Sequence, residues 1–139
     1  SCDAQALEDT FVCELNMDSF HELCGSIASM RNGMMRQVGM EIGREHQLLL
    51  TLGQMRTEER LATFLTGISE RNQSRGFSGR EFYLPMPRHD LANYLGMAVE
   101  TLSRMFSRLQ EDGIISVNHR LIEILAPERL KGLGHHQCR

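Results

Sequence analysis

Residues 88–125 read RHDLANYLGMAVETLSRMFSRLQEDGIISVNHRLIEIL, and this stretch decides the fold. Leu91, Ala92 and Leu95 recur at helical spacing, so they predict a short amphipathic helix with one apolar face. Gly96 ends that helix, because glycine tolerates the left-handed backbone that a sharp turn after a helix requires. The sequence therefore predicts a helix followed by a tight turn.

A second helix follows the turn, and its two faces differ in chemistry. The apolar stripe consists of Leu102, Met105, Phe106 and Leu109. The opposite face carries Glu100, Thr101, Ser103, Arg104, Ser107 and Arg108. A helix with such a polar face can enter the major groove of DNA and hydrogen-bond to base edges. The pattern predicts a helix-turn-helix, although a small helical domain with a solvated polar face is the open alternative.

Two strand-like runs, 114–117 and 121–125, come directly after the second helix. Only Asn118, His119 and Arg120 separate them, so we expect them to pair as a β-hairpin. A hairpin in this position is typical of the wing of a winged-helix domain. Its tip would bring His119 and Arg120 close to a phosphate backbone.

The composition allows this interpretation without requiring it. The chain has 139 residues, of which 41% are hydrophobic, enough for one domain or one domain plus an appendage. No run of about 18 apolar residues and no signal peptide is evident, so we expect a soluble, cytoplasmic protein without a membrane partner. The net charge is −3, with three basic and eight acidic residues in 1–55 but twelve and ten in 56–139. DNA affinity would therefore depend on a few well-placed arginines.

A proline-free segment, residues 26–55, predicts one long helix. Its seam positions step by three and four residues, the spacing of a coiled coil, and are Met35, Val38, Ile42, Glu45, Leu49 and Leu52. We expect this helix to pair in a homodimer, although an ordinary core helix is the open alternative. In a parallel pair Glu45 would face its own copy, and the repulsion would cost about 1 kcal/mol or more, which suggests a control point.

The segments on either side of this helix give weaker signals. Thr10–Leu15 is a strand candidate, and Asp18 is expected to cap a brief helix through Cys24. This opening resembles the end of a larger β domain, so we expect the chain to be a fragment. Further along, Thr57 is expected to cap a helix whose buried face is Leu61, Phe64, Leu65 and Ile68, and a strand is expected at 81–84.

These stretches together resemble the C-terminal half of an FNR-type (fumarate and nitrate reduction) regulator of the cyclic-AMP receptor protein superfamily. The resemblance rests on AQALEDTFVCEL, the seam helix, EERLATFL, RGFSGREF, DLANYLG and VETLSR. It implies a mainly α-helical fold with little β structure. The implied parts are a remnant of a β-roll sensor domain at 1–25, a dimerisation helix at 26–55 and a winged helix-turn-helix DNA-binding domain at 56–139.

The resemblance also implies site residues for a transcription regulator. Glu100, Ser103 and Arg104 would read a TTGAT half-site in double-stranded DNA. The implied phosphate contacts are Arg88, Thr101, Arg108, His119 and Arg120. Phe77 and Ser78 match a loop that contacts RNA polymerase, although Phe77 could equally be tucked under a helix.

Oxygen sensing is implied through a [4Fe–4S] cluster, for which Cys13 matches the fourth cysteine ligand. The residue-level alternative for Cys13 is a buried, inert thiol. The other three ligands would lie in an absent N-terminal region, so no cluster is expected in this fragment. A tail with His135, His136 and Cys138 could bind a stray metal, but a disordered terminus is the expected state. Glu45 matches the acidic position that opposes dimerisation until the cluster is intact.

Two positions depart from the family pattern. Ala98 stands where the recognition helix usually opens with Ser or Thr, and His119 stands where the wing tip usually has Gly. No catalytic constellation emerges from the scattered histidines, so we expect no enzyme. A helical dimerisation or interaction module without DNA binding is the remaining alternative.

Overall fold

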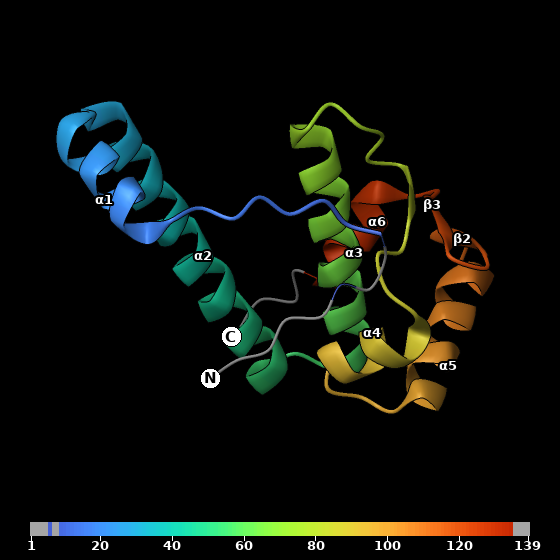
Figure 1. Ribbon diagram of the computed structural model, residues 1–139. Helices are drawn as coiled ribbons and strands as arrows, with labels where there is room; N and C mark the ends of the chain where they lie inside the picture. The colour runs from blue at the N-terminus through green and yellow to red at the C-terminus, as the bar shows by residue number, and fades with distance from the viewer. Residues whose placement is uncertain (1–5, 7–8, 135–139) are drawn as a thin grey trace. The chain divides into compact units, whose positions relative to one another are not determined.

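The computed structural model describes Ala6 and residues 9–134, and it divides into two compact units, 1–50 and 51–139. The first unit contains α1 (Met17–Ser26) and most of α2 (Ala28–Gln54), as Figure 1 shows. α2 confirms the predicted long helix. The side chains of residues 47, 48, 50–52 and 54 lie outside the description.

Two expectations for the N-terminal segment are wrong. Thr10–Leu15 forms no strand, and Phe11 and Val12 are exposed to solvent. A strand needs a partner backbone for its N–H and C=O groups, and the strand pairs among the described residues lie within 81–124. The cap of α1 is Asn16 rather than Asp18. The Asn16 side-chain oxygen accepts hydrogen bonds from the Asp18 and Ser19 amides at 2.9 and 3.3 Å.

The second unit packs four helices against a small sheet (Figure 1). Its elements are α3 (Thr57–Ser74), β1 (Glu81–Tyr83), α4 (Arg88–Tyr94), α5 (Val99–Glu111), β2 (Ile115–Asn118), β3 (Leu121–Ile124) and α6 (Pro127–Gly134). The helix-turn-helix, the hairpin and the preceding strand are thus confirmed. α3 begins one residue earlier than expected, because Arg56 rather than Thr57 is its N-cap and the Glu59 carboxylate accepts the Arg56 N–H at 2.9 Å.

The sheet is antiparallel with strand order β1-β3-β2, so the wing hairpin gains a third strand. Phe82 pairs with Ile122, and Val117 pairs with Ile122 from the other side. The inward side chains of the sheet join a core with α3, α4 and α5 in which Leu61, Leu91 and Leu102 are fully buried. This core supports one face of α5 and leaves its other face outside.

The turns before and after α5 both contain a glycine with a positive φ and the same pair of backbone hydrogen bonds. At the end of α4, Gly96 has a φ of 61°, its N–H binds the Asn93 carbonyl, and the Met97 N–H binds the Ala92 carbonyl. This is a Schellman motif, which reverses the chain within two residues. Gly113, with a φ of 65°, ends α5 in the same way. The predicted role of Gly96 is therefore confirmed.

α6 was not expected from the sequence. It packs on α3, and Leu130 is buried between them with 1% exposure. Pro127 in its first turn and Glu128 beside it are typical of a helix start, and these are the signals that could have revealed it.

His119 at the wing tip has a φ of 55°, the left-handed region that favours glycine. We expect His119→Gly to stabilise the fold by about 1 kcal/mol, because glycine adopts this backbone without a steric penalty. Thermal or urea unfolding measures the change, with His89→Gly as a helical control that should destabilise the fold. A His119→Gly variant that is less stable than the parent chain contradicts this account of the turn.

Candidate nucleic-acid interface

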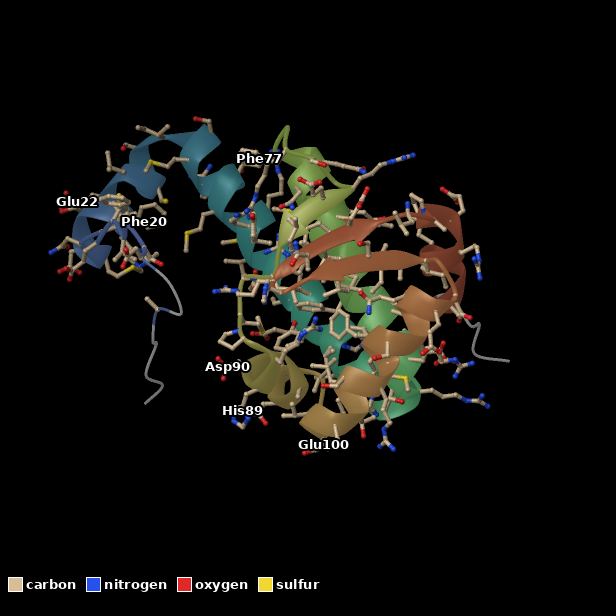
Figure 2. The ribbon with its side chains drawn as sticks, turned by 90° about the vertical axis from the view of Figure 1, so that its right-hand side faces the viewer. Phe20, Glu22, Phe77, His89, Asp90 and Glu100 are labelled. Carbon is tan, nitrogen blue, oxygen red and sulfur yellow. The ribbon has the colours of Figure 1, made fainter. Side chains whose placement is uncertain are left out.

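α5 presents a polar face built on a buried one. Leu102 and Leu109 are fully buried, and Phe106 is 4% exposed. Glu100, Ser103 and Arg104 lie one helical turn apart and are all exposed. In Figure 2, Glu100 lies at the outer end of the second unit, at the start of α5. The three side chains therefore share one solvent-facing surface.

The contacts of this trio with described residues are weak. The Arg104 Nη2 donates a long, 3.4 Å hydrogen bond to the Thr101 hydroxyl one turn earlier. Among the described residues, no ion pair involves Glu100 or Arg104. A carboxylate, a hydroxyl and a guanidinium with open donors and acceptors can hydrogen-bond to base edges.

Arginines hold the two ends of α5. Arg60 donates from Nε to the Met55 carbonyl at 3.0 Å, and from Nη1 to the carbonyls of Leu95 and Gly96 at 3.1 and 3.3 Å. These bonds join the start of α3 to the turn that precedes α5. At the other end, Arg129 on α6 donates from Nη1 to the Asp112 carbonyl at 2.8 Å. The orientation of α5 thus depends on side chains that sequence patterns did not single out.

Three of the predicted phosphate contacts are engaged within the fold. Arg120 donates from Nε and Nη2 to the Leu84 carbonyl at 3.1 and 2.8 Å. Arg108 forms an ion pair with Glu58 at 3.2 Å. The guanidinium carbon of Arg88 lies 3.4 Å from the centroid of the Phe106 ring, and burial lowers the pKa of Arg88. Their contact with phosphate stays a prediction.

Of the two remaining predicted phosphate contacts, Thr101 is partly buried and His119 is exposed at the wing tip. His89 and Asp90, in the first turn of α4, lie at the same end of the unit as Glu100 (Figure 2). The His89 ring is 3.2 Å from the Asn93 amide nitrogen. These two α4 side chains belong to the candidate interface, and their position next to Arg88 was the available signal.

The loop after α3 lies at the opposite end of the unit from Glu100 (Figure 2). Phe77 is 68% exposed, so it is not tucked under a helix. The Ser78 hydroxyl accepts hydrogen bonds from the Arg80 and Glu81 amides at 3.2 and 3.0 Å, which fixes the loop backbone.

The seam positions of α2 whose side chains are described point to solvent. Met35, Val38, Ile42 and Leu49 are between 45% and 69% exposed, and Glu45 is exposed as well. The side chain of Leu52 lies outside the description. A row of apolar side chains at coiled-coil spacing is therefore left without cover in the single chain.

Cys13 is exposed, so the alternative that it is a buried, inert thiol is wrong. Within the described part of the chain, no three His, Cys, Asp or Glu side chains are grouped as a metal site. One cysteine supplies one of the four ligands of a [4Fe–4S] cluster, so these residues alone do not fit that group. The tail positions His135, His136 and Cys138 lie outside the described residues.

No helix among the described residues is long and apolar enough to span a membrane.

Comparisons with known proteins agree on one family. Residues 59–133 match the family model of the Crp-like helix-turn-helix domain. The anaerobic regulatory protein of Pasteurella multocida is 46% identical over 87% of this chain and 44% of its own length. The fumarate and nitrate reduction regulatory protein of Salmonella typhimurium is 41% identical over 96% of this chain and 53% of its own length. The chain thus spans about half the length of these relatives.

A solved structure has a similar fold. The structure of FixK2 from Bradyrhizobium japonicum is similar with a TM-score of 0.78 and 28% identity, over 87% of this chain and 60% of that one. The predicted fold class, mainly α-helical with a small sheet and a helix-turn-helix, is confirmed.

Ala98, the N-cap of α5, supplies no side-chain hydrogen bond to the helix start, as the sequence indicated. We expect Ala98→Ser to stabilise the fold by about 1 kcal/mol, because a serine hydroxyl accepts an unpaired amide of the first turn. Chemical denaturation checks the change, with Ala98→Val, which has no acceptor, as the control. Equal stabilities for the serine and valine variants would contradict the assignment of Ala98 as an uncompensated cap.

Proposed function

We infer the function from one premise: the chain belongs to the family of proteins with a Crp-like helix-turn-helix domain. We propose that it is the DNA-binding part of a dimeric transcription regulator that reads TTGAT-like half-sites through α5. The observation that carries the proposal is the exposed trio Glu100, Ser103 and Arg104 on a helix whose opposite face is buried. The names of the relatives, which include regulatory proteins, support the same class of activity.

Each member of the trio has a matching base edge. The Arg104 guanidinium can donate two parallel hydrogen bonds to O6 and N7 of guanine. The Glu100 carboxylate can accept from an exocyclic amino group of cytosine or adenine, and Ser103 can contact a neighbouring thymine. The wing and the start of α4 lie beside α5 and would fix the register on the phosphate backbone.

The exposed seam of α2 supports dimerisation. Pairing would cover Met35, Val38 and Ile42, and it would place two recognition helices about one turn of DNA apart. Glu45 would lie in the same seam and weaken the pairing. A module that only dimerises shares this seam, so the DNA-binding experiment below distinguishes the two functions.

We extend the proposal to an oxygen response and to RNA polymerase. The Pasteurella relative is called an anaerobic regulatory protein. Cys13 would supply one of four thiolates for an iron–sulfur cluster in a longer protein, and a cysteine exposed in this chain is free to do so. The exposed Phe77 and the fixed loop around Ser78 would form the polymerase contact.

Loss of the Arg104 side chain tests base reading. We expect Arg104→Ala to reduce the preference for a TTGAT palindrome over a scrambled duplex by about 1–3 kcal/mol, because the fork to guanine is lost. Binding titrations at one fixed salt concentration measure both affinities. Arg75→Ala removes an equal charge from an exposed residue at the far end of α3, and it should leave the preference unchanged. An unchanged preference in Arg104→Ala rejects the assignment.

A second variant tests the seam. We expect Glu45→Leu to tighten dimerisation by about 1 kcal/mol or more, because it replaces a carboxylate pair with apolar contact. Sedimentation equilibrium measures the dissociation constant. The control Arg44→Leu lies at heptad position c, away from the seam, and removes only a surface ion pair with Glu41, so it should leave dimerisation unaltered. If both variants dimerise alike, the proposed seam is wrong.

A further inference from the structure

We propose that Arg88 is a positioning residue, which sets α5 against α4 by stacking its guanidinium on the ring of Phe106. This inference rests on the proposed function, because it assigns a role within the same DNA-facing surface. It replaces the sequence-based expectation that Arg88 serves mainly as a phosphate contact.

The contact joins two helices at a defined place. Arg88 is the first residue of α4, and Phe106 lies two turns into α5, beyond the base-reading trio. The guanidinium carbon lies 3.4 Å from the ring centroid, which is van der Waals distance for a flat group over an aromatic face. Phe106 itself is 4% exposed and belongs to the core of the unit. The cation therefore covers the ring where α4 meets α5.

One nitrogen of the guanidinium is enclosed by the protein, although Arg88 as a whole is only partly buried. Its Nη1 atom is buried and has no hydrogen-bond partner in the described part of the chain. A buried nitrogen cannot reach a phosphate unless the side chain moves. By contrast, Arg60, Arg120 and Arg129 all donate to backbone carbonyls. Arg88 differs from these arginines because the ring face is its main contact.

The electrostatic setting also argues against a simple surface cation. A positive charge in the first turn of α4 opposes the helix dipole. Partial burial further disfavours the charged form and lowers the pKa of Arg88, although the group stays protonated at neutral pH. These costs are offset by the flat, close-packed contact with the ring. Only a planar group can make such a contact, so lysine cannot replace arginine here.

The position of Phe106 links this contact to base reading. Ser103 lies one turn before Phe106 on the same helix, and the trio and the ring are on one rigid segment. A small rotation of α5 about the Phe106 contact would therefore move all three base-reading side chains together. Loss of the stack should reduce discrimination between sequences more than it reduces general affinity for DNA.

The test compares Arg88→Lys, Arg88→Met, Phe106→Leu and the double variant Arg88→Lys/Phe106→Leu in the 139-residue chain. Each is titrated with a TTGAT palindrome and a scrambled duplex at several salt concentrations, and each is also unfolded thermally. Lysine retains the charge for a phosphate but not the flat stack. Leucine retains an apolar side chain of similar size but offers no ring face.

Positioning predicts that Arg88→Lys, Arg88→Met and Phe106→Leu each lose about tenfold in discrimination, and that the double variant loses no more than either single variant. The salt dependence for the palindrome should be the same for lysine and methionine. A phosphate contact predicts the opposite pattern: lysine behaves as the parent chain, methionine flattens the salt slope by about one unit, and the effects of Phe106→Leu simply add. That pattern overturns the inference.

The proposed function fails separately, if the parent chain itself does not distinguish the palindrome from the scrambled duplex. In that event thermal unfolding still decides the role of Arg88. Non-additive losses of stability for Arg88→Lys and Phe106→Leu support the stack, whereas additive losses contradict it.

Discussion

The candidate nucleic-acid interface depends on the way in which α4 and α5 are held together. Gly96 reverses the chain with a φ of 61°, and two Schellman hydrogen bonds stabilise the turn. Leu91, Leu95 and Leu102 are buried at this junction and hold both helices on the core. Because α5 is an amphipathic helix, fixing its buried face also fixes the direction of the trio on the opposite face.

Most arginines near this surface form contacts within the protein. Arg60 and Arg129 secure the two ends of α5 by donating to backbone carbonyls, and Arg120 does the same for the segment before α4. This use of arginine agrees with a chain whose net charge is −3. In the proposed function, sequence specificity comes from a few exposed groups on α5. A general attraction to phosphates contributes little to that specificity.

Local signals were sufficient for the helix-turn-helix and its wing, because a glycine turn, an amphipathic stripe and paired apolar runs are encoded by neighbouring residues. The strand expected at 10–15 was wrong because strand formation needs a partner that local sequence does not provide. Asn16 caps α1 in place of the expected Asp18, because its side-chain oxygen accepts the Asp18 and Ser19 amides. Arg56 is the N-cap of α3 in place of Thr57, and the Glu59 carboxylate accepts the Arg56 N–H. α6 is short, and its stability comes from packing on α3.

For the site, the exposure of Glu100, Ser103 and Arg104 followed from helical periodicity, whereas the partners of each arginine did not. Arg88 and Phe106 meet through the tertiary fold, so no spacing rule could reveal their contact. The most direct measurement is an NMR titration of the chain with a TTGAT duplex. We expect the largest shifts in the amides of α5 around this trio, with the outer surfaces of α3 and α6 unaffected. Shifts confined to α3, α6 or the Phe77 loop would contradict it.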